Sequence, residues 1–316
     1  MGAALHGMVP TDAPILVACS GGPDSVATLI AVARAHAGAV TAAWFDHAMR
    51  PSAEVAREGS LVRRVTYALG VSVVEGRSGT TPRGEAAART ARYRWLARVA
   101  LKAGAVACVT GHTRDDQAET VLLRLVRGAG ARGAAGMAPD SPWPVGTPSD
   151  SPVRLLRPLL DTSRHDVEAY LAALELEAAH DPSNESREYA RNRVRHDVLP
   201  LLTEVNSEAT AHLAAFAGRE REDDAALTAW AERWLDKHAT VSSGGALALP
   251  SAELVGLPPA VARRALVGAG ARLGIPLGEA HIEALVRLAW GSGGRMTLPG
   301  ALAEQRGTVL RMRRSA

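Results

Sequence analysis

The sequence predicts an α/β fold: a parallel sheet of about five strands with helices on both faces, followed by a small, mostly helical C-terminal domain. First, four short apolar runs alternate with four helical patterns between residues 14 and 126. Second, these runs are continuously apolar, as in parallel strands that are covered on both faces. Third, the length of 316 residues favours two domains at roughly 150 residues per domain.

Each predicted strand leads into a helix. The strands span residues 14–19, 40–45, 71–74 and 105–109. One face of the first helix has the spacing of an amphipathic helix and carries Val26, Leu29, Ile30 and Ala33. The later helices span residues 54–69, 85–102 and 114–126.

The next segment is less regular. Five prolines fall within residues 138–152, a composition typical of an exposed loop. Order resumes at residues 157–160, and a helix capped by Ser163 is predicted over residues 163–176. Residues 181–200 are polar and rich in arginine. A boundary near residues 205–209 then gives domains of 1–208 and 209–316.

The second domain is predicted mainly from helical patterns. One long pattern covers residues 209–238, and shorter ones cover residues 258–273 and 278–289. Short apolar runs around Gly300 and Gly307 predict a small strand pair between residues 295 and 312.

Composition excludes several classes of protein. A hydrophobic fraction of 47% is enough for packed cores and excludes wholesale disorder. The most apolar stretch, residues 26–45, is interrupted by charge, so we expect no membrane span, and residues 1–10 do not resemble a signal peptide. Cys19 and Cys108 form no C-x-x-C pair, which excludes a disulfide framework and a cysteine-ligated cluster. The expected compartment is the cytoplasm.

Basic charge is unevenly placed along the chain. The formal net charge is only +3, yet residues 50–102 carry eleven Lys+Arg and four Asp+Glu, a local excess of +7. Residues 305–316 hold four arginines and no acid. One interpretation is a footprint for a phosphate backbone. The alternative is a set of solvated helix faces.

The strongest motif is Ser20-Gly21-Gly22-Pro23-Asp24-Ser25, between the first strand and the first helix. Two glycines let the backbone approach an anion, and the following helix directs its N–H groups at it. The pattern favours a pyrophosphate group as the ligand, and Asp24 could hold a Mg²⁺ ion that bridges phosphates. The alternative is a plain turn with Asp24 or Ser25 as the N-cap. A lysine-containing G-x-x-x-x-G-K-[ST] loop is excluded, because neither Lys102 nor Lys237 follows a glycine.

The motif at residues 20–25 resembles the pyrophosphate loop of the N-type ATP pyrophosphatases, or PP-loop proteins, which cleave ATP to AMP and pyrophosphate. Four further blocks, in this order, resemble the tRNA(Ile)-lysidine synthetase family within that superfamily. They are Phe45-Asp46-His47-Ala48-Met49-Arg50, Ala88-Arg89-Thr90-Ala91-Arg92-Tyr93, residues 111–120 with 124–128, and Asp181-Pro182-Ser183-Asn184 with residues 189–195. The resemblance covers residues 14–200 and is weaker beyond residue 209.

The resemblance implies a Rossmann-like PP-loop fold and a specific reaction. ATP and Mg²⁺ would adenylate the C2 carbonyl oxygen of the cytidine at the first anticodon position of an isoleucine tRNA with a CAU anticodon. The ε-amine of free L-lysine would then attack C2, and AMP would leave. The C-terminal domain would help to hold the tRNA. The oligomeric state stays open, with a homodimer as one possibility.

His112, Asp116 and Glu119 are the candidates for the lysine end of the site. His112 follows the fourth strand, at the edge where open α/β sheets bind ligands. Asp116 and Glu119 are three residues apart and can reach one ligand, either an ammonium or Mg²⁺. Two alternatives stay open: Thr113 and Asp116 match a capping box, and Glu119 could lie on a solvated helix face.

The remaining candidates come from the other blocks. Phe45, Asp46 and His47 are candidate nucleotide-site residues, because they lie at the end of the second strand. The other candidates for the nucleotide site are the loop residues Ser20, Gly21, Gly22, Pro23, Asp24 and Ser25. Arg92 is assigned to catalysis and Arg89 to the substrate, because arginine binds phosphate bidentately; a solvated face is the alternative. Asp115, Arg191, Asn192 and Arg195 are assigned to the tRNA side, with a surface salt bridge to Glu188 or Asp197 as the alternative for the two arginines.

Three other functions share parts of this pattern. A tRNA thiolase would need paired cysteines or a cluster motif, which the sequence lacks. GMP and NAD synthetases do not resemble the block at residues 181–195. An RNA-binding module with a dead ATP site is disfavoured, because Asp24, Asp116 and Glu119 are intact.

Overall fold

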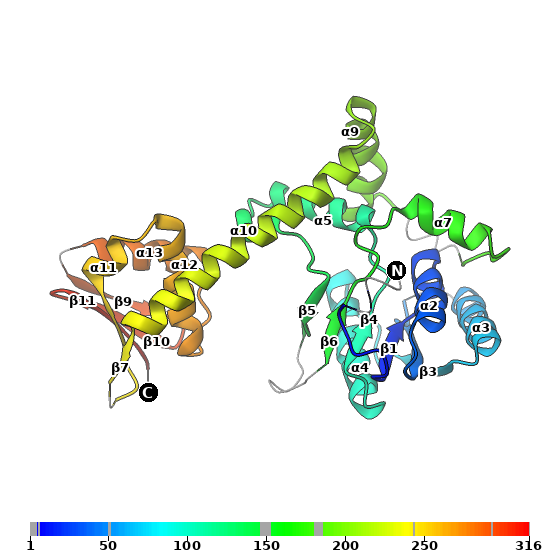
Figure 1. The fold of residues 1–316 in the computed structure, drawn as a ribbon, viewed down its shortest axis with the longest axis horizontal. Helices are drawn as coiled ribbons and strands as arrows, with labels where there is room; N and C mark the ends of the chain where they lie inside the picture. Colours follow the sequence, from blue (N-terminus) through cyan, green and yellow to red (C-terminus); the bar gives the residue numbers. More distant parts are fainter. Residues whose placement is uncertain are drawn as a thin grey trace. The chain divides into compact units, whose positions relative to one another are not determined.

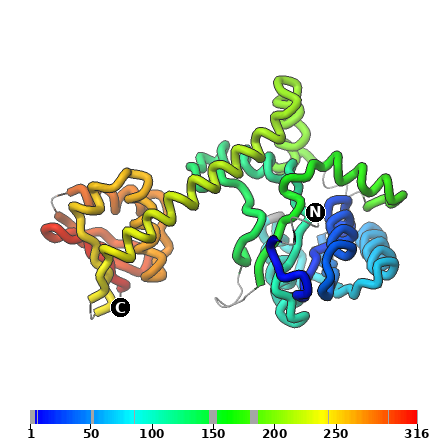
Figure 2. The backbone as a smooth tube through the Cα atoms, in the orientation of Figure 1, coloured from blue at the N-terminus to red at the C-terminus, as the bar shows by residue number. Residues whose placement is uncertain are grey.

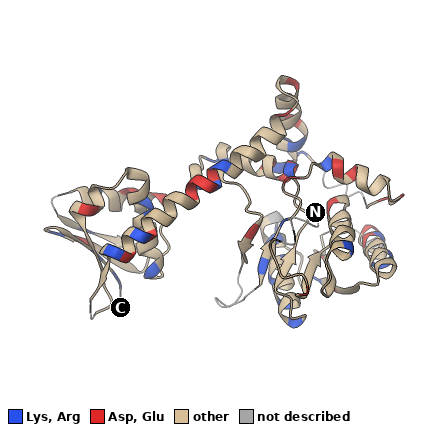
Figure 3. Ribbon diagram, in the orientation of Figure 1, with Lys and Arg blue, Asp and Glu red and all other residues tan. Residues whose placement is uncertain are grey.

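The computed structural model describes residues 5, 7–49, 52–145, 153–179, 186–242, 244–291 and 293–315. The chain divides into two compact units, Met1–Glu220 and Arg221–Ala316. The division falls within the long helix α10 (Ala209–His238), whose first residue coincides with the predicted domain boundary. Basic and acidic residues both occur along this helix (Figure 3).

The first unit begins with alternating strands and helices, as predicted (Figure 1). In chain order they are β1 (Ile15–Ala18), α2 (Pro23–Ala35), β2 (Val40–Asp46), α3 (Ser52–Leu69), β3 (Ser72–Arg77), α4 (Glu85–Lys102), β4 (Ala107–Val109) and α5 (Arg114–Val126). Among the described residues, six strands form one sheet in the order β3-β2-β1-β4-β6-β5. All neighbours pair in parallel except β5 (Asp140–Pro142), which runs antiparallel to β6 (Arg154–Leu156).

Helices cover both faces of this sheet because successive strand residues point to opposite sides. Ile15 and Val17 of β1 pack in one core with α2, α3 and α7 (Arg164–Ala172). Leu16 packs in another core with Leu96 of α4. The tube in Figure 2 shows α7 lying against α2, although about 130 residues separate them in sequence.

The strand order places a switch point between β1 and β4. The chain moves outward from β1 through β2 to β3 and then returns, through α4, to the other side of β1. At such a point the chains that leave the two strands lead to opposite sides, and open α/β proteins bind ligands in the crevice outside the carboxyl ends of these strands. This edge of the sheet is called the crevice below.

After β6 the unit continues mainly as helices. These are α7, α8 (Ala190–Arg193), the π-helix η2 (Val194–Val198) and α9 (Leu199–Val205); α6 (Ala131–Ala134) precedes β5. Val194 and Leu199 pack with Ala118 of α5. This packing brings the polar, arginine-rich segment back onto the helix that follows β4.

The second unit combines helices with a sheet. Helices α11 (Ser251–Val255), α12 (Pro259–Arg272) and α13 (Glu279–Trp290) share a core with the sheet strands. Within the described part of this unit the strand order is β7-β8-β11-β10-β9, all antiparallel. The predicted strand pair corresponds to β10 (Ala301–Arg306) and β11 (Val309–Arg314), with β9 (Gly294–Leu298) beside it. The sheet is larger than predicted because β7 (Thr240–Val241) and β8 (Leu247–Pro250) add to the other edge of β11.

Three further features of the described residues bear on the sequence analysis. The loop at residues 138–152 contains the short strand β5, and its residues 146–152 lie outside the described part of the chain, as do Arg50 and residues 180–185. No helix in the described ranges is long and apolar enough to cross a membrane. Cys19 and Cys108 are both free and buried, as expected for residues that fill strand interiors.

Candidate active site at the carboxyl edge of the sheet

The loop after β1 leaves the start of α2 open to a ligand. The N-cap of α2 is Gly22, which has no side-chain cap, and Pro23 follows it. The Ser25 hydroxyl accepts from the Ser20 backbone N–H (3.1 Å) and donates to the Gly22 carbonyl (2.8 Å), so it braces the loop. Neither Asp24 nor Ser25 is the N-cap, so that alternative is wrong. The first N–H groups of α2 are therefore available to an anion.

Glycine is required on both sides of the crevice. Gly21 has φ +95°, and a Cβ there would lie 3.2 Å from Cβ of Glu58. A Cβ on Gly111, after β4, would lie 2.5 Å from the Asp24 carbonyl oxygen and 2.7 Å from Oγ1 of Thr28. A larger residue at Gly111 would push the β4 loop away from α2, and one at Gly21 would be strained by the positive φ and crowded by α3. The glycine in the third sequence block thus lets the β4 loop approach the pyrophosphate loop.

Asp24 is poised for a cation. Its Oδ1 is buried and makes no hydrogen bond within the described residues, and its Oδ2 lies 3.8 Å from Nε of Arg164. Burial, and next the negative charge of Asp116, raise the pKa of Asp24 to about 6, against the opposing charges of Arg164 and Arg195. A carboxylate in this environment gains from any further positive charge.

These residues fit Mg²⁺ bound together with phosphates. The described residues contain no cluster of three or more His, Cys, Asp or Glu side chains that could hold a metal. The described side chains therefore do not form a complete coordination shell. One carboxylate with a free oxygen, beside an open helix N-terminus, suits Mg²⁺, which usually keeps water and phosphate ligands. Asp24 would hold the ion, and the loop N–H groups would hold the phosphates.

Asp116 and Glu119 lie on α5 and are enclosed by arginines. Asp116 is 7% exposed and Glu119 0%, so Glu119 does not lie on a solvated face. Arg191 Nε contacts Glu119 Oε2 (2.7 Å), and its Nη2 contacts Asp116 Oδ1 (2.9 Å). Arg195 Nε contacts Glu119 Oε1 at 2.6 Å. Arg164 Nη2 lies 3.4 Å from Asp116 Oδ1.

The capping interpretation of Asp116 is also confirmed. Its Oδ2 accepts from the Thr113 backbone N–H at 2.8 Å, and its own N–H donates to Oγ1 of Thr113. Capping uses one carboxylate oxygen and leaves Oδ1 for the arginines. Burial alone would raise the pKa of Asp116, but Arg191, His112 and Arg164 outweigh it and lower the pKa to about 2.

His112 is held neutral. Its Nδ1 lies 2.9 Å from the Thr110 hydroxyl. Desolvation lowers its pKa to about 3; Asp116 opposes this shift, and the charges of Arg157, Arg191 and Arg92 add to it. At pH 7 the imidazole therefore carries no charge and can serve as a neutral hydrogen-bonding group.

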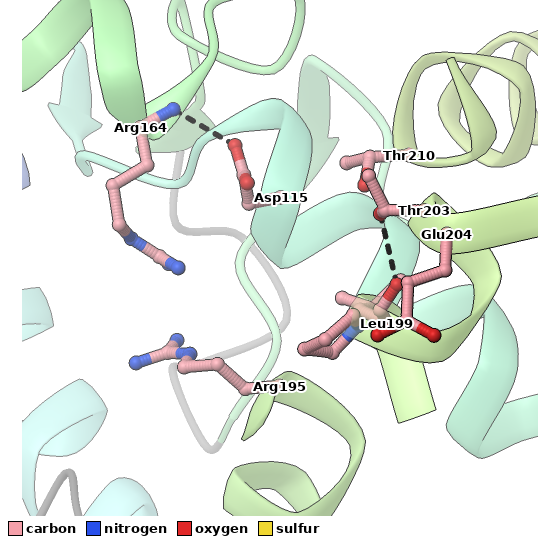
Figure 4. Close-up of a pocket in the computed structure, with 8 residues that line it drawn as sticks. Asp115, Arg164, Arg195, Leu199, Thr203, Glu204 and Thr210 are labelled. Atoms are coloured by element: carbon pink, nitrogen blue, oxygen red, sulfur yellow. Dashed lines mark hydrogen bonds between the residues drawn. The ribbon is translucent and has the colours of Figure 1, made fainter. Parts of the chain in front are cut away.

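A cavity of about 440 Å³ opens beside the carboxylates (Figure 4). Charged residues of both signs line the cavity: Arg164 and Arg195 are basic, and Asp115 and Glu204 are acidic. The Arg164 and Arg195 side chains converge in Figure 4, and Oδ2 of Asp115 accepts from the Arg164 backbone N–H at 2.8 Å. Leu199, Pro200, Thr203 and Thr210 complete the wall. Such a lining suits a small zwitterion.

The second-strand residues lie at the same carboxyl edge, one strand further out. Asp46 ends β2, accepts from the Ala48 backbone N–H (2.7 Å) and pairs with Arg77 (3.1 Å). The Phe45 ring contacts the rings of His47 and Trp95. Asp46 thus shapes the turn, and Ala48 adopts φ +57° there. Their role toward a nucleotide stays a prediction.

The predicted phosphate arginines stack on one tyrosine. The Cζ atoms of Arg89 and Arg92 lie 4.8 Å and 5.4 Å from the ring centroid of Tyr93. Asn192 is buried and donates to the Ser186 carbonyl at 2.9 Å, so it braces the segment that carries Arg191. Roles of Arg89, Arg92, Arg191, Asn192 and Arg195 toward tRNA stay predictions.

Sequence reasoning missed Arg164. This residue is the first of α7 and faces Asp24, Asp116 and Glu119 at once. A cation in the first turn of a helix is unfavourable with the helix dipole. An arginine at this position was therefore a sequence signal for a nearby anionic partner. The surface salt bridges considered for Arg191 and Arg195 are not what the structure has, since Asp197 pairs with Arg187.

The fold and the site together define a class of protein. Residues 4–202 match the family model described as a PP-loop domain. Among solved structures, the U34-tRNA thiolase NcsA from Methanococcus maripaludis, with its [4Fe-4S] cluster, has a TM-score of 0.56 and 14% identity, covering 69% of this chain and 76% of that one. That likeness shows the fold. The chain is a PP-loop protein with an ATP-binding domain.

Closer relatives define the family. The tRNA(Ile)-lysidine synthase of Thermobifida fusca is 40% identical over 313 residues, covering 93% of this chain and 89% of that protein. The tRNA(Ile)-lysidine synthase of Salinispora tropica is 43% identical over 310 residues, covering 93% and 88%. This chain therefore belongs to the tRNA(Ile)-lysidine synthase family, a family of ligase-type enzymes, and the predicted family is confirmed.

Proposed function

We propose that this enzyme works in the cytoplasm and joins free L-lysine to C2 of the first anticodon cytidine of an isoleucine tRNA with a CAU anticodon. ATP first adenylates the C2 carbonyl oxygen and releases pyrophosphate; the lysine ε-amine then displaces AMP. The observation that carries the proposal is the identity of about 40% with tRNA(Ile)-lysidine synthases along 93% of the chain. Activation is chemically necessary, because the C2 carbonyl is a poor electrophile.

The adenylation half-reaction is assigned to the crevice between the β1 and β4 loops. The open N-terminus of α2 would bind the pyrophosphate portion of ATP. Mg²⁺ on Asp24 would supply charge stabilisation as pyrophosphate departs. Arg164, which lies beside Asp24, would stabilise the same developing charge.

The lysine half-reaction is assigned to Asp116, Glu119 and the adjoining cavity. In the cavity, Arg164 and Arg195 suit the α-carboxylate of lysine, and Asp115 and Glu204 suit its α-ammonium. The side chain would then extend toward Asp116 and Glu119. Recognition of both α-groups would favour the free amino acid over a lysine inside a protein.

The amine must lose a proton before it attacks. From a pKa of about 10.4, forming the neutral amine at pH 7 costs roughly 4.6 kcal/mol. Two carboxylates alone would raise the cost of removing this proton, because they stabilise the ammonium. The three arginines that surround Asp116 and Glu119 cancel those charges and so favour the neutral amine.

A pyrophosphate-release assay with and without tRNA tests the class of reaction. The proposal expects release that depends on a cytidine at the first anticodon position and occurs without lysine, because adenylation comes first. Release without any tRNA would favour a small-molecule synthetase of the same fold. No release by the folded protein would favour an RNA-binding module.

A further inference from the structure

Four arginines near the site lack the carboxylate partners that Arg164, Arg191 and Arg195 have. They are Arg89, Arg92, Arg124 and Arg157, and none forms an ion pair with a carboxylate of the described residues. Arg157 is only 6% exposed. Uncompensated cations in a partly buried place are costly unless an anion joins them.

Arg89, Arg92 and Arg157 lie around Tyr93. Arg89 and Arg92 stack on its ring, and the Trp143 ring meets it edge-on at 5.5 Å. Arg157, after β6, donates through Nη1 to the Ala138 carbonyl (2.6 Å) and to Oγ of Ser141 (3.1 Å). These bonds hold the segment that leads to Trp143.

Arg124 of α5 braces the same segment from the other side. Its Nη1 donates to the carbonyls of Gly136 (2.7 Å) and Gly133 (3.1 Å). The six side chains of Arg89, Arg92, Tyr93, Arg124, Trp143 and Arg157 are called the Tyr93 cluster below.

The Tyr93 cluster has hydrogen-bond donors without acceptors. Nε of Arg157 and Nε1 of Trp143 are buried and have no acceptor among the described residues, and the buried Tyr93 hydroxyl likewise has no acceptor there for its proton. Tyr93 is 0% exposed. The guanidiniums of Arg92 and Arg157 hydrogen-bond to the Tyr93 oxygen, and because a guanidinium can only donate, they leave the hydroxyl proton without an acceptor. Buried donors almost always have an acceptor, and the described residues do not supply one here.

The cationic groups also repel one another. Burial and the charge of Arg89 lower the pKa of Arg92. Burial and then the charges of Arg89 and Arg124 lower the pKa of Arg157, although Tyr93 opposes this. An anion with several acceptor oxygens would relieve the repulsion and satisfy the donors together.

We propose that the Tyr93 cluster is a binding site for a phosphate group, with the Tyr93 hydroxyl and Arg157 as ligands beside Arg89 and Arg92. Phosphate offers the acceptor oxygens and the negative charge that these donors lack, and arginine pairs with it bidentately. The phosphate would belong to the tRNA backbone or to ATP, and this assignment rests on the proposed function.

The substitution Tyr93→Phe is the sharpest test, because it removes one hydroxyl and keeps the ring on which the arginines stack. Equilibrium binding is measured separately for Mg·ATP and for an anticodon stem–loop RNA. We expect one of these dissociation constants to rise about ten-fold, as for loss of a hydrogen bond to a charged group, with a melting temperature equal to or above that of the wild type. The affected ligand identifies the source of the phosphate.

Two further variants complete the test. Arg157→Lys keeps the charge but loses Nε, and should weaken binding of the same ligand. Arg98→Gln makes a charge change on the exposed side of α4 and should have a smaller effect than Arg92→Gln. Unchanged binding of both ligands by folded Tyr93→Phe and Arg157→Lys would overturn the site, and so would equal effects of Arg98→Gln and Arg92→Gln. Lysidine formation by the wild type is scored separately, so failure of the site and failure of the function are distinguishable.

Discussion

Arg195 holds both carboxylate oxygens of Glu119, with Nε 2.6 Å from Oε1 and Nη2 3.2 Å from Oε2. Glu119 is fully buried, and Arg195 lies on the π-helix η2, 76 residues later in the chain. π-Helical turns occur often at functional sites. The pair therefore makes the segment after α8 part of the site that follows β4.

Glu119→Gln should lower both stability and lysine transfer. Arg191 and Arg195 would keep their charges in a buried place with one carboxylate fewer, which we expect to cost about 3 kcal/mol in the free energy of unfolding. Adenylated tRNA should still form, whereas lysine transfer should fall, because Arg191 and Arg195 lose the carboxylate that positions them around the lysine amine. Denaturant unfolding and trapping of labelled AMP on tRNA measure the two effects.

Glu188→Gln is the matched control for that variant, since Glu188 is exposed in the neighbouring segment. It should change neither quantity. Equal loss of adenylation and lysine transfer in Glu119→Gln would instead place Glu119 on Mg²⁺.

Asp24→Asn should abolish pyrophosphate release without destabilising the fold. The folded-state pKa of Asp24 is raised to about 6 from 3.8, so the protonated form is the one that folding favours. Its contribution to stability is complete below about pH 4 and is lost as the pH rises through about 6. At pH 7.5 the uncharged Asn should give an equal or higher melting temperature. Normal pyrophosphate release by the folded variant would contradict the magnesium role; Asp12→Asn, an exposed site, is the control.

The pH profile of pyrophosphate release should show one acidic limb. Mg²⁺ needs the ionised form of Asp24, so at limiting Mg²⁺ activity should fall as the pH drops through about 6, and saturating Mg²⁺ should move this limb to lower pH. His112, with a pKa lowered to about 3, should add no inflection between pH 5 and 8. An inflection near pH 7 that disappears in His112→Asn would show that this histidine titrates during the reaction.

Binding of tRNA should weaken steeply with salt. We expect this because residues 50–102 carry a local excess of +7 in charge. Each phosphate contact should add about −0.9 to the log–log slope on duplex RNA and about −0.7 on single strands. Fluorescence titrations between low and physiological salt measure the slope, and a flat curve would remove the phosphate-footprint interpretation.

Sequence patterns predicted the parts of the fold that repeat. Strands β1 to β4 are apolar runs followed by helices, and the glycine-rich loop lies directly between β1 and α2. The strands β5 and β7 span only Asp140–Pro142 and Thr240–Val241. Elements that short carry no periodicity, so only tertiary pairing with β6 and β8 reveals them.

The site was predictable where its chemistry is local. Asp24 and the capping role of Asp116 follow from neighbours in sequence. The enclosure of Glu119 does not, because its partners come from distant segments. Arg191 and Arg195 reach it through packing of Val194 and Leu199 on α5, and Arg164 reaches it from α7, which packs on α2. The sequence left a solvated helix face open for Glu119, because periodicity cannot distinguish water from arginine as the surroundings of a polar residue.

Mass spectrometry of nucleosides tests the central claim most directly. The wild-type chain is incubated with ATP, Mg²⁺, lysine and an isoleucine tRNA transcript that has a CAU anticodon, and the RNA is then digested to nucleosides. We predict one modified cytidine per tRNA, heavier than cytidine by one lysine less one water, formed only when ATP and lysine are both present. Unmodified cytidine from an enzyme that binds the tRNA and is fully folded would contradict the account.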